Sequence, residues 1–385
     1  MGEFPDTASI VIVGGGITGC ALAYELAVLG VEDVLVCERD YLTAGSTGRC
    51  GAGIRQQWGL EMNIRLSRAS CRILETLPEH LDYPRGIEFK QGGYLILAYA
   101  EKQLEQFRKN VARQNELGVP SRVLSPREAM DIVPHLSAEG LLGATFCHED
   151  GHANPFHTTH AYALAARRAG VRFALDTRVT DIEVRGDRVV GVETSRGYVA
   201  TPLVFNAAGS HSAEIGAMAG VDLPVYTERH QILATEPVGR MLDPMVVSFS
   251  HHIYCQQVPH GSFLMGRGDP DEPRGINNES SWLFLERMAR SVATIMPPLA
   301  ELRVVRQWSG GYNVSPDSQP ILGDVPGLEG YWMAVGFSGH GFMVAPMAVR
   351  VLAQTIAGSD PEMDIGALNL GRFERGELLL EPNVV

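Results

Sequence analysis

The sequence predicts an α/β fold that opens with a Rossmann-like βαβ unit. Residues 10–13 are an apolar run typical of a buried strand, and the Gly-x-Gly-x-x-Gly motif of residues 14–19 follows directly, ahead of an Ala/Leu-rich helical stretch. A second apolar run at 34–37 ends in Glu38. In this order the helix N-terminus faces the phosphates of a dinucleotide, and the acidic residue binds a ribose. We therefore expect a dinucleotide site at the start of the chain.

Length, charge and cysteine usage narrow the class of protein. The chain has 385 residues, enough for about two domains. Its net charge of −13 argues against a nucleic-acid partner. The six cysteines stand singly without a CxxC pair, which favours a cytoplasmic location. The apolar stretch 10–36 contains Glu25, Glu32 and Asp33 and lacks a basic leader, so we expect no membrane span there.

Periodicity predicts further elements along the chain. We expect helices at 101–117, 158–169, 282–296 and 342–357, and strands at 93–99, 141–147, 203–206 and 331–335. Ser125 and Glu128 have the spacing of a capping box, with a proline at the first helical position between them.

Four glycine-rich segments carry a resemblance to a known superfamily. They are residues 14–19 with Glu38, 45–49 with 53–57, 206–209, and 336–342. Together they resemble the FAD enzymes that include D-amino-acid oxidase, glycine oxidase and sarcosine oxidase. The run 50–57, Cys-Gly-Ala-Gly-Ile-Arg-Gln-Gln, is most similar to the β subunits of hetero-oligomeric L-proline dehydrogenases and sarcosine oxidases.

The resemblance implies a particular architecture. It predicts a Rossmann-like, glutathione-reductase-like FAD-binding domain and a second, antiparallel-sheet substrate domain, both discontinuous in sequence. We expect the FAD-binding domain to comprise 1–85, 145–225 and 310–385, and the substrate-binding domain to comprise 86–144 and 226–309.

The resemblance also assigns residues to FAD. The glycine motif would lie against the pyrophosphate, Glu38 would bind the adenosine ribose, and Val179 would contact adenine. The segment 339–343 would cradle the isoalloxazine ring. The cofactor residues implied are Gly14, Gly16, Ile17, Thr18, Gly19, Glu38, Arg39, Ser46, Thr47, Arg49, Val179, Ala208, Gly209, Gly310, Gly339, His340, Gly341, Phe342 and Met343. Physical chemistry supports the last group, because a glycine-rich turn before a helix offers free N–H groups and a positive dipole end.

Arg55 is the predicted substrate residue. Relatives in this superfamily place an arginine here to bind the substrate carboxylate, and the planar guanidinium suits a bidentate contact. Tyr254 and His252 are further candidates for the same pocket. Met343 stands where monomeric sarcosine oxidases carry a helper lysine, so Arg55 acts alone or with another donor.

The predicted reaction is FAD-dependent oxidation of a small secondary amino acid, such as sarcosine or L-proline, to the imine by hydride transfer to flavin N5. The chain would be the catalytic β-type subunit, with an α-type subunit or another electron acceptor as partner. No lysine stands in the segment 266–270, where oxidases of this kind activate oxygen; Arg267 is the cation present there. The alternative is a stand-alone glycine or D-amino-acid oxidase that produces hydrogen peroxide. Other classes left open are an NAD(P) dehydrogenase and a non-catalytic subunit that keeps FAD for stability.

Two further questions concern flavin attachment and metals. Gly310 and Gly311 stand where monomeric sarcosine oxidases carry the tethering cysteine, so we expect non-covalent FAD. His157 resembles the histidine that tethers FMN in heterotetrameric relatives, which leaves a second flavin in a hetero-oligomer open. The segment 148–152 matches HExxH, but its Asp-Gly turn signal and the proline that soon follows argue against the helix that zinc binding requires. We expect no metal.

Overall fold

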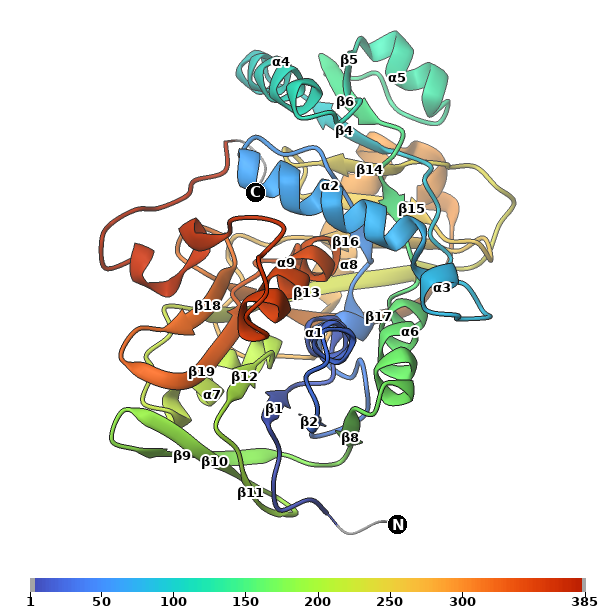
Figure 1. Ribbon diagram of the computed structural model, residues 1–385. Coiled ribbons are helices and arrows are strands. Elements are labelled where there is room, and N and C mark those ends of the chain that lie inside the picture. Colours follow the sequence, from blue (N-terminus) through green and yellow to red (C-terminus); the bar gives the residue numbers. More distant parts are fainter. Residues whose placement is uncertain (1–3, 383–385) are drawn as a thin grey trace.

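The computed structural model describes residues 4–382, and it confirms the predicted α/β class. Within these residues the strands form two large sheets and a short ribbon. In Figure 1 the first sheet and its hairpin strands occupy the lower half of the molecule, and part of the second sheet lies at the top beneath two helices.

The first sheet contains the βαβ unit that the glycine motif predicts. Its strand order is β11-β10-β19-β12-β1-β2-β8, with β18 paired to β19 and β9 paired to β10. The strands are β1 (Ile10–Val13), β2 (Val34–Cys37), β8 (Arg172–Ala174), β9 (Val179–Arg185), β10 (Arg188–Thr194), β11 (Gly197–Ala200), β12 (Val204–Asn206), β18 (Ile321–Val325) and β19 (Leu328–Val335). Strand β1 pairs in parallel with β2 and β12, so segments from both halves of the chain meet at the carboxyl end of β1.

Helices bury both faces of this sheet. They are α1 (Ile17–Val28), α2 (Glu61–Glu75), α3 (Leu77–His80), α6 (Pro155–Arg168), α7 (Ser212–Met218) and α9 (Gly341–Ile356). Helix α7 lies on the face of Val11 and Val13, and the others lie on the side of Ile10 and Ile12.

Helix α1 packs against α6 and α9, and α9 packs against α2. Pro346 lies inside α9. The Ser70 hydroxyl of α2 donates to the Val344 carbonyl and accepts from the Met347 amide, which ties α2 to α9 beside this proline.

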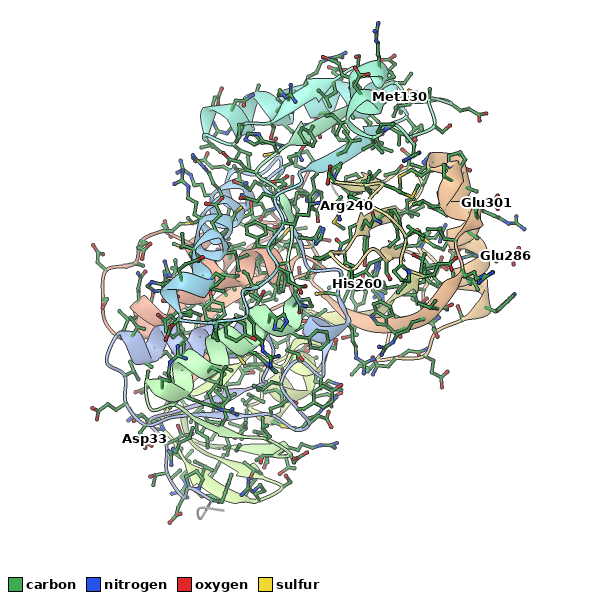
Figure 2. The ribbon with its side chains drawn as sticks, turned by 90° about the vertical axis from the view of Figure 1, so that its right-hand side faces the viewer. Asp33, Met130, Arg240, His260, Glu286 and Glu301 are labelled. Carbon is green, nitrogen blue, oxygen red and sulfur yellow. The ribbon has the colours of Figure 1, made fainter. Side chains whose placement is uncertain are left out.

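The second sheet has the order β17-β13-β16-β15-β14-β4-β6-β5 and is mostly antiparallel. Its strands are β4 (Tyr94–Ala98), β5 (Arg122–Leu124), β6 (Gly143–Cys147), β13 (Tyr226–Thr235), β14 (Met245–Ser248), β15 (Ile253–Gln257), β16 (Phe263–Arg267) and β17 (Val304–Val314). Helices α4 (Glu101–Glu116), α5 (Pro126–Ile132) and α8 (Trp282–Ile295) flank it. Figure 2 shows Glu286 on α8 and Glu301 at the outer side of this layer, with Met130 of α5 above them.

Several local predictions are confirmed. The capping box of Ser125 and Glu128 opens α5 with both of its hydrogen bonds. Helices α4, α8 and α9 begin and end within one residue of the expected bounds, whereas α6 begins three residues early because Asn154 caps it ahead of Pro155. No helix within residues 4–382 is long and apolar enough to cross a membrane.

The domain division remains a prediction. Strands of the first sheet come from residues 10–37, 172–206 and 321–335, and strands of the second from 94–98, 122–147 and 226–314. Strand β17 therefore continues five residues beyond the expected boundary at 309. Residues 1–3 and 383–385 of the expected FAD-binding domain lie outside the described residues.

Candidate active site

The glycine motif forms a close turn between β1 and α1. Gly14 has φ +117°, and a Cβ atom there would lie 2.5 Å from the Ala207 carbonyl oxygen. A Cβ atom on Gly19 would collide with the Gly14 carbonyl, so the third glycine allows the helix to pack on the turn. The Ile17 amide donates to Thr47 Oγ1 at 3.1 Å, and the first helical hydrogen bond begins at Cys20. The amides of Thr18 and Gly19 have no carbonyl of the helix to bond and are suited to phosphate.

Glu38 shapes this turn as well as its cavity. One carboxylate oxygen accepts from the Gly15 amide at 2.7 Å, and the other accepts from the Asp40 amide at 2.9 Å. Each oxygen keeps a second lone pair. Glu38 thus fixes the glycine turn while its carboxylate lines the space where a ribose would bind.

An extended cavity of about 410 Å³ runs from the glycine turn to the start of α9. Its lining includes Gly14, Gly16, Ile17, Thr18, Glu38, Arg39, Ser46, Thr47, Arg49, Ala208, Gly209, Gly339, Gly341 and Phe342 among the predicted cofactor residues. A second cavity of about 300 Å³ continues past Gly14 and Glu38 to Val179. The course of these two cavities past the glycine turn and Glu38, and their glycine-lined walls, fit a dinucleotide.

The far end of the cavity meets the N-terminus of α9. Gly339 has φ +94°, and a Cβ atom there would lie 2.5 Å from the Tyr312 ring, so only glycine fits. The Met343 amide bonds to the His340 carbonyl, but the amides of Gly341 and Phe342 precede the first turn's hydrogen bonds. These two N–H groups and the helix dipole suit the electron-rich edge of a flavin ring. The residues present therefore fit FAD.

A third cavity of about 350 Å³ adjoins this end. Five residues line both it and the long cavity: Cys50, Tyr312, Ser338, Gly339 and Phe342. Arg55, Tyr254, His252 and Met343, the four predicted substrate residues, all contribute to its lining. His252 has φ +56° in the turn between β14 and β15 and is exposed, so it lies at the mouth.

Arg55 is a buried cation that faces this cavity. Its guanidinium carbon lies 3.8 Å from the centre of the Trp58 ring and 5.8 Å from that of Phe249. Burial lowers the pKa of Arg55, and the negative charges of Glu381 and Asp150 oppose that effect. Within residues 4–382, none of the ion pairs shorter than 4.0 Å includes Arg55. Its planar fork is therefore free to bind a carboxylate.

The backbone around Arg55 is held by a buried carboxyl group. Asp150 accepts from the Gln56 amide at 2.8 Å and from Gln57 Nε2 at 2.9 Å. Next to these contacts, β3 (Gly53–Ile54) and β7 (Gly151–His152) pair as a short antiparallel ribbon. The ribbon joins the residues just before Arg55 to those just after Asp150. Burial raises the pKa of Asp150 to about 7, although the bonds from Gln57 and Gln56 and the charge of Arg55 lower it in part.

A stack of three aromatic rings forms another wall of the cavity. His230 lies between Tyr312, whose ring centre is 4.4 Å away, and Tyr254, at 5.6 Å, and all three rings are nearly parallel. Burial lowers the pKa of His230 to about 4, so the ring is neutral at pH 7. Its Nε2 atom is buried and has no hydrogen-bond partner among the described residues.

His340 is a second neutral histidine in this cavity. Burial and the nearby charge of Arg55 lower its pKa to about 3. Its ring centre lies 5.0 Å from that of Trp58, and its Nε2 is also without a partner in the described part of the chain. Both histidines are therefore neutral at pH 7 and add no positive charge beside Arg55.

Some predicted residues lie elsewhere, and some lining residues were not predicted. Gly310 is absent from the linings of the three cavities, because it packs against the Arg49 side chain; Gly311 lines the long cavity instead. His340 and Met343 line only the third cavity. The unpredicted residues include Trp58, Glu228, His230 and Tyr312, which no local motif marks. Arg267 does not line the third cavity, whereas its neighbour Gly268 does.

Two candidates from the sequence remain, the HExxH match at 148–152 and the histidine at 157. The HExxH match does not form a helix, because His152 lies in strand β7. Asp150, between its two histidines, accepts hydrogen bonds from Gln56 and Gln57. Within residues 4–382, no three His, Cys, Asp or Glu side chains are grouped to hold a metal ion. His157 lies in the first turn of α6, where its Nδ1 is 2.9 Å from the Tyr83 hydroxyl. A flavin tether there remains untested.

Comparisons with known proteins agree with this geometry. Residues 9–355 match the family model of FAD-dependent oxidoreductases of the DAO type. The β subunit of sarcosine oxidase from Arthrobacter sp. is 30% identical, and the match covers 97% of this chain and 92% of that one. The corresponding subunit from Rhodobacter capsulatus is 29% identical over 97% and 90%. The crystal structure of L-proline dehydrogenase from P. horikoshii superposes with a TM-score of 0.92 at 35% identity, over 98% of this chain and 100% of that one.

The extended glycine-lined cavity, the free amides at its two helix N-termini and these matches lead to one assignment. The chain belongs to the DAO family of FAD-dependent oxidoreductases.

Proposed function

We propose that this enzyme oxidises a small secondary amino acid, such as sarcosine or L-proline, to its imine. The proposal rests on the position of Arg55: its buried guanidinium faces a cavity next to the FAD path and has no carboxylate partner within residues 4–382. A buried, unpaired cation is costly to maintain, and a substrate carboxylate would compensate it. The β-subunit and L-proline dehydrogenase relatives support the choice of secondary amines.

In the proposed complex Arg55 binds the substrate carboxylate with two parallel hydrogen bonds. Trp58 covers one face of the guanidinium and excludes water from it. This contact fixes one end of the substrate and leaves its amine and the adjacent carbon to face the flavin side of the cavity.

The aromatic wall would receive the amine. Its low pKa keeps the His230 imidazole neutral at pH 7, so the ring nitrogen that carries no proton can accept a hydrogen bond from a neutral amine N–H. Burial also disfavours the protonated form of the amine, whose lone pair is needed when the carbon–hydrogen bond breaks. Tyr254 and Tyr312 hold the imidazole plane from both sides.

FAD, when bound, accepts a hydride equivalent from the substrate. The chain would hold it through the glycine turn, Ser46, Thr47 and the α9 amides, without a covalent bond. The α9 N-terminus would stabilise negative charge on the ring.

We further propose that the chain works as a β-type subunit in the cytoplasm and passes electrons to a partner rather than to oxygen. The names of the sarcosine oxidase relatives support the subunit role. The lack of a lysine in the segment 266–270 supports slow reaction with oxygen.

The test is an anaerobic screen of sarcosine, L-proline, glycine and D-alanine. The proposal expects sarcosine or L-proline to bleach the flavin absorbance fastest. Preference for glycine or D-alanine with rapid peroxide production would instead favour the stand-alone oxidase.

A further inference from the structure

We propose that Glu381 is a positioning residue for substrate binding: it holds the segment 58–63 that supports Arg55, from a site more than 300 residues away in sequence. The inference rests on the proposed role of Arg55.

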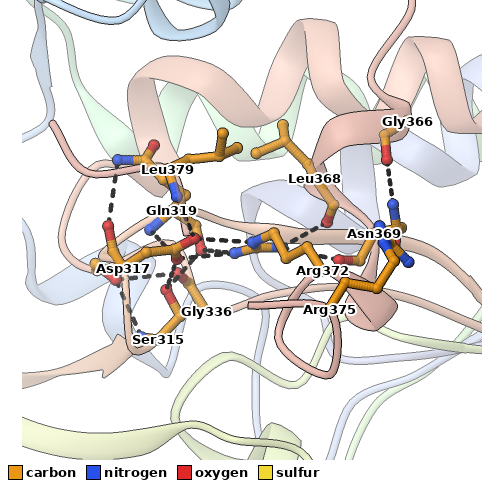
Figure 3. Close-up of polar contacts among 11 residues, drawn as sticks. Ser315, Asp317, Gln319, Gly336, Gly366, Leu368, Asn369, Arg372, Arg375 and Leu379 are labelled. Atoms are coloured by element: carbon orange, nitrogen blue, oxygen red, sulfur yellow. Dashed lines mark hydrogen bonds and ion pairs between the residues drawn. The ribbon is translucent and has the colours of Figure 1, made fainter. Parts of the chain in front are cut away.

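The segment that carries Glu381 is anchored firmly to the FAD-binding core. Arg372 is fully buried and makes a bidentate pair with Asp317, with contacts of 2.8 and 2.9 Å (Figure 3). Arg372 also donates to the carbonyls of Leu368 and Gln319. The Leu379 amide donates to the same Asp317 carboxylate at 3.2 Å, so the chain is pinned two residues before Glu381.

Glu381 then caps helix α2. Its carboxylate accepts from the amides of Gly59 and Leu60 and from Asn63 Nδ2, the last at 2.7 Å. Leu60, the N-cap residue, supplies no side-chain cap of its own. An anion at a helix N-terminus is favoured by the free amides and the helix dipole. A Cβ atom on Gly59 would lie 2.5 Å from Pro382, so glycine is needed for this close approach.

The capped segment leads directly to the substrate site. Trp58, the residue before Gly59, lies over the Arg55 guanidinium, and its Nε1 donates to the Arg55 carbonyl at 3.0 Å. Asp150 holds the opposite side of this segment through Gln56 and Gln57. The position of Arg55 is thus set from two sides, by Asp150, the residue before β7, and by Glu381 through Trp58.

Two carboxyl groups lie close enough to act on Arg55, yet neither forms an ion pair with it among the described residues. The oxygens of Glu381 and Asp150 accept hydrogen bonds from amide donors, and these two groups act on Arg55 at longer range when they are ionised. The cation is stabilised without a carboxylate in its fork, which leaves that fork to the substrate.

The experiment compares four variants as FAD-loaded protein: Glu381→Ala, Glu381→Gln, Glu377→Gln and Arg55→Lys. Glu377 lies in the same segment but is exposed, and within the described residues its carboxylate forms an ion pair with Arg375 alone, at 2.8 Å, so its variant is the matched control. Glu381→Gln keeps an acceptor oxygen for the Gly59 and Leu60 amides. The readouts are kcat and KM for the amino acid that bleaches the flavin, the Kd of cyclopentanecarboxylate from flavin absorbance, and Tm.

We expect Glu381→Ala to raise KM and the Kd of the carboxylate by roughly 10- to 100-fold, because a displacement of about 1 Å is enough for such losses. Its kcat should stay within about twofold at saturation, since Glu381 does not touch the reacting atoms. Glu381→Gln should recover most of the binding, and Glu377→Gln should match the parent. A lower Tm for Glu381→Ala with unchanged KM and Kd would overturn the inference. Unchanged KM and Kd in Arg55→Lys would instead refute the proposed function.

Discussion

The guanidinium of Arg55 lies 3.8 Å from the centre of the Trp58 ring, inside a cavity that shares residues with the FAD path. A cation–π contact in a desolvated place contributes about 2 kcal/mol, and it leaves the edge of the guanidinium plane open. The pairing therefore stabilises a buried cation without consuming the hydrogen-bond donors that a carboxylate needs.

Replacing Arg55 tests this directly. Arg55→Lys keeps the charge but removes the planar fork, so KM should rise by roughly 10- to 100-fold, equal to about 1.4 to 2.7 kcal/mol of binding. Steady-state kinetics with the bleaching substrate measure the effect. Arg122, which is exposed and lies 5.9 Å from the Phe146 ring centre, offers a matched Arg122→Lys control with unchanged kinetics. Equal KM values in the two variants would remove Arg55 from the substrate site.

The role of His230 is tested by deleting its acceptor. His230→Phe keeps a ring between Tyr254 and Tyr312 but cannot accept a hydrogen bond. Loss of one such bond to a buried group costs about 1 to 3 kcal/mol, so kcat/KM should fall by roughly 5- to 150-fold. His260, an exposed turn residue (Figure 2), provides the control His260→Phe. An unaltered kcat/KM for His230→Phe would make the stack a packing feature only.

The raised pKa of Asp150 predicts how the free energy of unfolding depends on pH. Burial raises its pKa from 3.8 to about 7, so between these values the folded protein binds a proton that the unfolded chain has released. The stabilisation from this proton is complete below pH 3.8 and is lost as pH rises towards 7. The free energy of unfolding of the parent, relative to that of Asp150→Asn, should therefore decline across this window. Chemical denaturation of both proteins at several pH values measures it, and a constant difference would contradict the assignment.

Removing one partner of the buried Arg372–Asp317 pair should lower the free energy of unfolding strongly. Both side chains are buried, and removing one partner leaves an uncompensated charge. Burial alone would raise the pKa of Asp317, but the bonds from Arg372 and the Leu379 amide outweigh it and lower the pKa. Arg372→Met should lower the free energy of unfolding by about 3 to 5 kcal/mol, and adding Asp317→Leu should restore much of it. A single-variant loss below about 1 kcal/mol would show that the pair is not needed.

The parts of the site that follow from local sequence could be predicted. The glycine turn, Glu38 and the α9 N-terminus each depend on a short run of residues whose backbone requirements are visible in the sequence. The family resemblance points to Arg55, but its burial and its stacking on Trp58 depend on tertiary packing.

The remaining residues could not be predicted because long-range pairing places them. His230 and Glu228 enter the cavity through the register of β13 with β17, which sets His230 opposite Gly310 and Glu228 opposite Tyr312. Glu381 contacts Gly59 across 322 residues of sequence. No periodicity within a single segment encodes such contacts, since they depend on how the two sheets and the segment after α9 meet.

We propose that this chain uses FAD to oxidise a small secondary amino acid bound by Arg55. The most direct measurement mixes the purified yellow protein with sarcosine or L-proline in the absence of oxygen and follows the flavin absorbance. We predict that one of these amino acids bleaches the flavin rapidly and that the colour returns slowly in air. In Arg55→Lys the KM for that amino acid should be at least about tenfold higher. A flavin that neither amino acid bleaches would contradict the proposal, as would rapid, stoichiometric hydrogen peroxide production with glycine or D-alanine.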